Sequence, residues 1–151
     1  MPLSQSPYAA TKIAGDQLAL SYFKSFNLPV TIVRPFNTFG PRQSARAIIP
    51  TIISQALKRD KIKLGFLNTK RNFNYIDTTI DGYLAAIKSS KGIGEIINLG
   101  SDLEVSIRDL VKIISKSLKK RLLIEVEKKR IRPKKSEIFR LVADNKKAKK
   151  L

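Results

Sequence analysis

The sequence predicts an α/β protein built from short buried strands and amphipathic helices. Short apolar runs rich in Val and Ile alternate along the chain with segments whose apolar residues follow helical spacing. The 151 residues suit one ordinary domain, and a hydrophobic content of 42% is enough for a packed core. No internal repeat or low-complexity linker divides the chain. Strands separated in this way by helices are typical of parallel sheets.

The first elements are a helix, a strand and a loop. Pro7 suits the first turn of a helix with Ser6 as its cap, and the helical pattern runs from about Tyr8 to Phe26. Residues 30–33 form a β-branched run between two prolines, which predicts a buried strand. The following stretch, 35–44, contains Pro, Gly and Asn and is expected to be the loop at the carboxyl end of that strand.

The middle of the chain continues the alternation. A second helix is expected over 45–58, where Pro50 would kink or restart it. The pattern then predicts a strand, a polar segment, a helix, a glycine-containing turn and another buried strand, at 62–65, 71–76, 79–89, 92–94 and 96–99.

The last third contains one strongly periodic helix. Ser106 and Asp109 form a variant capping box, with Asp in place of the usual Glu or Gln, and helical spacing continues to Leu118. A strand is expected over 122–126, and Asp144 is placed to cap a short final helix.

The composition excludes several kinds of site. The chain has neither Cys nor His, which removes disulfides, thiolate zinc sites and the usual base of a catalytic triad. No apolar run approaches the roughly 20 residues that span a bilayer, and no signal peptide opens the sequence. We therefore expect no membrane association and a cytoplasmic location.

The net charge of +18 is concentrated in the last quarter of the chain, where residues 112–151 include 16 basic and 4 acidic residues. Such a surface would attract nucleic acid, anionic lipid or a phosphorylated metabolite. The basic residues are spread among helical and strand patterns, and no nucleic-acid-binding motif is present. The sequence therefore favours solvent-exposed lysines over a nucleic-acid-binding module.

Tyr8 and Lys12 are candidates for acid–base chemistry. Their spacing of four residues places both on one face of the first predicted helix. A neighbouring ammonium favours the phenolate form, which could accept a proton from a sugar hydroxyl. The same spacing also occurs as an incidental contact, so the pair alone does not establish catalysis.

The surrounding motifs identify a family. The element Ser6-Pro7-Tyr8-Ala9-Ala10-Thr11-Lys12, the following strand and the element Arg34-Pro35-Phe36-Asn37-Thr38-Phe39-Gly40-Pro41-Arg42 resemble extended short-chain dehydrogenases/reductases of the NAD-dependent epimerase/dehydratase type. The similarity is greatest to nucleotide-sugar 4,6-dehydratases of the dTDP-glucose or UDP-N-acetylglucosamine type. Later stretches agree with it, namely Ile49-Pro50, Ile62 to Gly65, Arg71 to Tyr75, Ile97 to Gly100 and Arg132-Pro133.

The resemblance implies the C-terminal part of a Rossmann-like parallel sheet together with a small α/β substrate-binding lobe. Residues 1–44 and 79–100 would form the remnant of the Rossmann-like domain, and 45–78 with 101–151 the lobe. The intact family binds NAD and a nucleotide-diphosphate sugar and commonly forms homodimers. Its dehydratases remove hydride at C4, eliminate water and return hydride to C6. A 4-epimerase of the same family and an inactive truncated product are the alternatives.

The resemblance also assigns residues. Tyr8 matches the catalytic tyrosine and Lys12 the lysine that holds the nicotinamide ribose. Pro35, Phe36 and Thr38 match cofactor contacts, although core packing explains Phe36 equally well. Substrate contacts are implied for a larger set: Asn37, Arg46, Lys63, Leu64, Gly65, Arg71 and Arg132. For the arginines, an exposed surface role is the alternative.

Two departures from the family pattern stand out. The family usually has Asp where this chain has Asn72, and a second acidic position falls on Thr78, which leaves Asp77 or Asp81 to compensate. The seven glycines do not form the glycine-rich turn that meets a dinucleotide pyrophosphate. We therefore expect this polypeptide to bind NAD weakly or not at all by itself, and activity would require a separately encoded N-terminal fragment.

Overall fold

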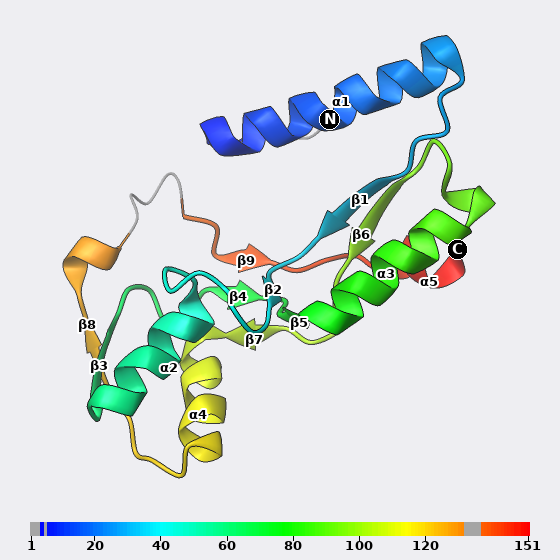
Figure 1. Cartoon of the computed structure of the whole chain (residues 1–151). Coiled ribbons are helices and arrows are strands. Elements are labelled where there is room, and N and C mark those ends of the chain that lie inside the picture. Colours follow the sequence, from blue (N-terminus) through cyan, green and yellow to red (C-terminus); the bar gives the residue numbers. More distant parts are fainter. Residues whose placement is uncertain (1–3, 5, 132–136) are drawn as a thin grey trace.

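The computed structural model describes residues 4, 6–131 and 137–151 and has an α/β fold (Figure 1). The helices are α1 (Pro7–Phe26), α2 (Ile48–Lys58), α3 (Ile76–Lys88), α4 (Ile107–Ser117) and α5 (Lys146–Lys150), with 3-10 turns η1 (Ser90–Gly92) and η2 (Lys128–Arg130). The strands are β1 (Ile32–Pro35), β2 (Thr38–Phe39), β3 (Lys61–Leu64), β4 (Lys70–Arg71), β5 (Asn74–Tyr75), β6 (Ile96–Leu99), β7 (Val105–Ser106), β8 (Leu123–Val126) and β9 (Arg140–Leu141).

Parallel pairing dominates the sheets. β1 pairs with β6, β2 with β5 and β3 with β8, each pair in parallel. In the one three-stranded sheet of the described residues, β4 lies between antiparallel β7 and parallel β9. Each longer pair joins strands far apart in sequence, with helices between them, as the alternating pattern predicts. The α/β prediction is confirmed.

A closed lobe, which we define as α2, β3, α4 and β8, contains the principal core. The apolar spacing of α4 gives the helix one continuous buried stripe, because positions three and four apart share a face. This stripe packs against α2 and β3 around the residues Ile52, Ala56, Ile62, Leu64, Ile107, Leu110, Val111 and Ile114. At its edge, the buried side chain of Gln55 donates to the carbonyl of Lys63 and accepts from its amide, at 3.1 and 2.9 Å.

An open layer, which we define as α1, β1, α3 and β6, buries much less. α1 lies apart from the other elements (Figure 1) and contains no buried residue. It contacts β1 through Asp16, which accepts a 2.7 Å hydrogen bond from Arg34. It contacts the turn before β6 through Phe23, whose ring packs over Gly94. No helix in the described part of the chain is long and apolar enough to cross a bilayer.

Several helices and strands begin at other residues than the sequence predicted. The first strand begins at Ile32 instead of residue 30. The Val30 carbonyl accepts a hydrogen bond from the amide of Gly94, which lies in the turn before β6 and not in a strand. The predicted loop over 35–44 contains β2. α2 begins at Ile48, so Pro50 lies in its first turn, where a missing N–H costs nothing.

The two helix N-caps predicted in the last third of the chain differ from the expectation. Ser106 Oγ accepts from the Asp109 amide at 3.0 Å, but the Asp109 carboxylate bonds the Ser106 hydroxyl at 2.6 Å instead of completing a capping box. Asp144 Oδ1 accepts from the Lys146 amide at 3.1 Å, while Asn145 is the residue that immediately precedes the helix. The predicted final helix is therefore confirmed, but its N-cap is Asn145 and not Asp144.

Candidate functional site

A cavity of about 490 Å³ lies where the loop after β1 meets the closed lobe. The loop after β1, the start of α2, the end of β3, β4 and the segment before β9 contribute to its wall. Six of the residues predicted from the sequence line it together: Asn37, Thr38, Arg46, Leu64, Gly65 and Arg71. These residues are distributed over 35 positions of the chain, so only the fold brings them to one site.

Asn37 is fixed at the cavity by hydrogen bonds in both directions. Its Nδ2 donates to the carbonyl of Asn72 at 2.8 Å, and its own carbonyl accepts from the amide of Asn74 at 3.2 Å. Asn74 is buried, and its Nδ2 donates to the carbonyl of Phe36 at 2.6 Å. The loop after β1 is therefore held in place by the segment that follows β4.

Among the described residues, three arginines and one carboxylate line the cavity. Arg71 forms an ion pair with Glu137 at 3.4 Å, and both side chains are largely buried, at 15% and 8% exposure. Arg130 also lines the cavity and pairs with Glu127 at 2.6 Å, and the third is the exposed Arg46. Planar, permanently charged guanidinium groups suit phosphate oxygens, so the cavity is chemically suited to an anionic ligand.

Gly65 lets two parts of the cavity wall approach closely. A Cβ at this position would lie 2.6 Å from the main-chain carbonyl oxygen of Arg130. Any side chain would therefore push the Arg130 segment away from the end of β3, because the clashing atom belongs to the backbone. The glycine preserves the spacing between β3 and this arginine.

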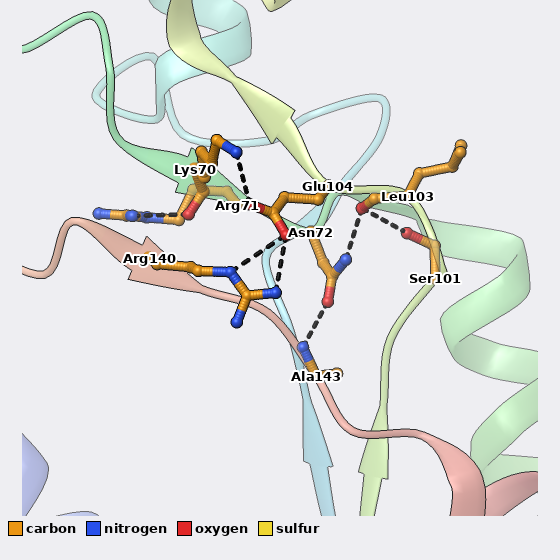
Figure 2. Close-up of polar contacts among 8 residues, drawn as sticks. All are labelled: Lys70, Arg71, Asn72, Ser101, Leu103, Glu104, Arg140 and Ala143. Atoms are coloured by element: carbon orange, nitrogen blue, oxygen red, sulfur yellow. Dashed lines mark hydrogen bonds and ion pairs between the residues drawn. The ribbon is translucent and has the colours of Figure 1, made fainter.

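A polar network joins β4, the segment before β7, and β9 (Figure 2). The Glu104 carboxylate bonds Arg140 at 2.8 Å and Lys70 at 3.1 Å. Hydrogen bonds from Arg140 and Lys70 hold the pKa of Glu104 at about 2, well below its usual value. Asn72, on the same segment as Arg71, bonds Leu103 and Ala143 through its side chain.

The remaining predicted residues lie elsewhere. Tyr8 is exposed on α1, and Lys12 Nζ lies 5.5 Å from the centre of its ring. Pro35 ends β1, and the amide of Phe36 donates to the carbonyl of Leu99 at 2.9 Å. Lys63 lies within β3 and outside the cavity lining. Arg132 falls outside the described residues.

α1 begins on the side toward which β1 points (Figure 1). Tyr8, in the first turn, is therefore at the same end of the open layer as the carboxyl end of β1 and the Asn37 loop. In open α/β sheets ligands bind outside the carboxyl ends of the strands.

Several cavity residues were missed by the sequence analysis, among them Gln43, Phe66, Thr69, Arg130 and Glu137. Glu137 had a usable signal, because it is one of only four acidic residues in the basic last quarter of the chain. Gln43 and Thr69 carried none, since polar residues in loops are common and only the fold turns them toward the cavity.

These features define a class of α/β protein in which a helix with a Tyr–Lys pair is tied to a parallel strand pair by an Asp16–Arg34 ion pair, and an arginine-lined cavity lies beside the carboxyl end of β1. The model of the family described as GDP-mannose 4,6 dehydratase matches residues 2–151. The chain belongs to this family of NAD-dependent nucleotide-sugar epimerases and dehydratases.

Individual relatives agree with the family assignment. The chain is 37% identical over 110 residues to a dTDP-D-glucose 4,6-dehydratase of Dictyostelium discoideum, covering 72% of this chain and 25% of the relative. The human dTDP-D-glucose 4,6-dehydratase is 34% identical over 116 residues, which are 76% of this chain and 33% of that protein. The chain therefore spans about a quarter to a third of these relatives.

Solved structures have the same fold. The Bacillus cereus UDP-glucuronic acid 4-epimerase, in complex with UDP-glucuronic acid and NAD, is 34% identical with a TM-score of 0.90, covering all of this chain and 48% of the epimerase. A dTDP-glucose 4,6-dehydratase of Bacillus anthracis in complex with NAD is 25% identical with a TM-score of 0.84, covering 99% of this chain and 47% of that protein. The Rossmann-like fold class predicted from the sequence is confirmed.

Proposed function

We propose that this chain is the catalytic-tyrosine and substrate-binding part of an NAD-dependent nucleotide-sugar 4,6-dehydratase. The observation that supports this most directly is the cavity that unites Asn37, Arg71 and Glu137 beside the carboxyl end of β1. Residues 1–44 and 79–100 would supply the Rossmann-like part of the site, and residues 45–78 with 101–151 the lobe that covers the nucleotide.

The substrate proposed for the cavity is a nucleotide-diphosphate sugar. Arg71 and Arg46 would pair with diphosphate oxygens, and the Asn37 amide, held by Asn72, would present its oxygen side to the ligand. The buried Glu137 carboxylate offers acceptors for hydroxyl groups on ribose or sugar. Arg132 is retained as a proposed contact from the family resemblance alone.

Tyr8 is proposed as the base that accepts the proton of the sugar 4-hydroxyl. Lys12, on the same face of α1, would stabilise the phenolate through its positive charge and hold the nicotinamide ribose. NAD, when bound, would accept the hydride from C4. Phe36 and Thr38 would contact the nicotinamide end of the cofactor, with Pro35 setting the direction of the loop.

The chain's own residues fit only one end of NAD. The glycines present do not form a pyrophosphate-binding turn. In addition, β1 and β6 pair only with each other in the described part of the chain, which leaves the outer edge of the sheet unpaired. We therefore propose that an N-terminal half, carrying the glycine-rich turn, completes both the sheet and the cofactor site. A homodimer of the completed enzyme is proposed from the resemblance.

A 4-epimerase is the second candidate, favoured by the similarity to the Bacillus cereus epimerase over the whole chain. The groups that would eliminate water in a dehydratase lie before the tyrosine in this family. The choice between the two reactions therefore depends on the half that completes the site.

The binding proposal is tested with dTDP and UDP by isothermal titration calorimetry on the chain itself. We expect binding of at least one nucleotide and a roughly 10- to 100-fold loss of affinity in Arg71→Gln, because a charge-assisted phosphate contact is lost. Arg121→Gln is the matched control, since it removes the same charge from an exposed position between α4 and β8 and should bind normally. Absence of nucleotide binding by the unmodified chain would contradict the proposal.

The catalytic proposal is tested by co-expression with the N-terminal half of a dTDP-glucose 4,6-dehydratase, followed by an assay for a 4-keto sugar nucleotide. Tyr8→Phe should lower product formation by roughly 10²- to 10⁴-fold, because the proton acceptor is removed. Tyr22→Phe, on the same helix, should retain activity. Equal activity of Tyr8→Phe and the unmodified chain would refute the assignment of the base.

A further inference from the structure

The side chain of Asn72 uses both its donor and its acceptor in hydrogen bonds. It is fully buried at 0% exposure and lies in the segment just after β4. Its Nδ2 donates to the carbonyl of Leu103 at 2.5 Å, and its Oδ1 accepts from the amide of Ala143 at 2.5 Å (Figure 2). One side chain thus joins three segments that are far apart in the sequence.

The two partners of Asn72 require a donor and an acceptor on the same planar group. A primary amide supplies both. An ionised carboxylate accepts only, so at this position it would bond Ala143 but would face the Leu103 carbonyl oxygen without a proton between them. The usual family Asp therefore does not fit the partners that this chain presents. Asp77 and Asp81 do not compensate for the change, because both are exposed on α3.

The backbone of Asn72 extends the connection to the cavity. Its amide donates to the carbonyl of Leu141 at 3.2 Å, and its carbonyl accepts from Asn37 Nδ2 at 2.8 Å. The orientation of the Asn37 amide therefore depends on where Asn72 holds the chain. The same residue also holds the stretch from Leu141 to Ala143, which follows the Glu137 side of the cavity.

We propose that Asn72 is a positioning residue that couples the C-terminal segment to the Asn37 loop, so that the two walls of the cavity keep one spacing. Its amide, in place of the family's carboxylate, is the group that makes this coupling in the present chain. The effect on ligand binding rests on the proposed function of the cavity, whereas the coupling itself does not.

The coupling is tested with Asn72→Asp, which changes one group and keeps the shape. At pH 7 we expect a Tm lowered by roughly 4–10 °C and faster hydrogen exchange at the Ala143 and Leu141 segment. Burial raises the pKa of a carboxyl group, so the folded variant binds its proton up to a higher pH than the unfolded chain. The deficit should therefore be smallest near pH 4, where a protonated Asp can donate to Leu103, and should grow as pH rises.

Asn68→Asp is the matched control, because it adds the same charge at an exposed residue four positions earlier. It should leave both the Tm and the exchange of the C-terminal segment close to those of the unmodified chain at every pH. If Asn72→Asp has a Tm deficit independent of pH, or exchanges at Ala143 no faster than Asn68→Asp, the proposal is wrong. Failure of Asn72→Asp to fold even at pH 4, where the unmodified chain folds, also overturns it.

Asn37→Ala separates the coupling from the ligand proposal. It removes the bond to the Asn72 carbonyl but leaves the side chain of Asn72 intact, so exchange at Ala143 should stay unchanged. Titration with UDP should give a roughly 10-fold weaker affinity for both Asn37→Ala and Asn72→Asp at pH 7. If the unmodified chain binds no UDP or dTDP, the proposed function fails while the exchange result still decides the coupling. If UDP binds both variants normally, the positioning role is refuted.

Discussion

The closed lobe and the open layer differ in how completely they bury their apolar residues. The lobe packs eight buried residues from α2, β3 and α4 into one continuous core. In the open layer, the only buried apolar residues of β1, α3 and β6 are Ile32, Ala86 and Ile97, while large side chains such as Ile87, at 79% exposure, face solvent. Helix α1 contributes no buried residue at all.

The amount of apolar burial indicates which region is stable by itself. Apolar burial is the main favourable term in folding, so the lobe has its own source of stability. The open layer has the sequence of a buried parallel sheet but lacks neighbours on its outer edge among the described residues. Two comparisons between matched substitutions and one single substitution, ordered from the largest expected effect to the smallest, test this contrast.

The largest effect is expected in the core of the closed lobe. Ile62→Ala removes a fully buried side chain of β3 and should lower the free energy of unfolding by about 3 kcal/mol, because it leaves a cavity in a packed core. Ile87→Ala makes the same change on the exposed face of α3 and should alter it by less than about 0.5 kcal/mol. Urea denaturation of both variants measures the difference. Equal losses would show that the open layer is as well packed as the lobe.

A smaller effect is expected at the helix caps. Ser106→Ala removes the hydroxyl that accepts from the Asp109 amide and should cost about 1 kcal/mol of global stability. Ser6→Ala removes the corresponding bond to the Ala9 amide at the start of α1. Because α1 contains no buried residue, we expect it to unfold locally, and this loss should appear as faster amide exchange in α1 with little change in the denaturation midpoint. A matching global loss in both variants would contradict the contrast.

The smallest effect concerns Glu104, which joins β4, β7 and β9 between the two regions. Its pKa of about 2 in the folded state lies below the usual value of 4.5. A depressed pKa contributes stability that is present above pH 4.5 and is lost as the pH falls toward 2. Glu104→Gln should therefore have a lower Tm at pH 7 and a weaker dependence of Tm on pH between 4.5 and 2. An unchanged pH dependence in this variant would refute the role of the ion pairs.

The longer elements could be predicted from the sequence. The spacing of Ile107, Leu110, Val111 and Ile114 predicted α4 because amphipathic periodicity is a local property, and β6 was found with its limits intact. The five two-residue strands, β2, β4, β5, β7 and β9, were not recognised. Their pairing depends on partners far along the chain, as where Lys70 lies opposite both Ser106 and Arg140.

The candidate site was predicted as far as the family motifs extend. Those motifs led to Asn37 and Arg71, which line the cavity. They gave no indication of the ion pair between Arg71 and Glu137, because ion-pair partners 66 positions apart cannot be inferred from spacing. Likewise, the departure at Asn72 was visible in the sequence, but its reason was not, since the partners Leu103 and Ala143 are defined only by the fold.

The edge of β1 that has no strand partner among the described residues has a consequence for how copies of this chain behave toward one another. An exposed strand edge is a template for pairing with a second copy, but each copy has a net charge of +18. Mutual repulsion therefore opposes self-association at low ionic strength, because the screening length is about 10 Å at 0.1 M salt. Near 1 M salt the screening length falls to about 3 Å, and the repulsion no longer acts over the distance between approaching copies. Concentrated salt removes that protection, whereas a complementary half with an acidic surface would be drawn to the same edge.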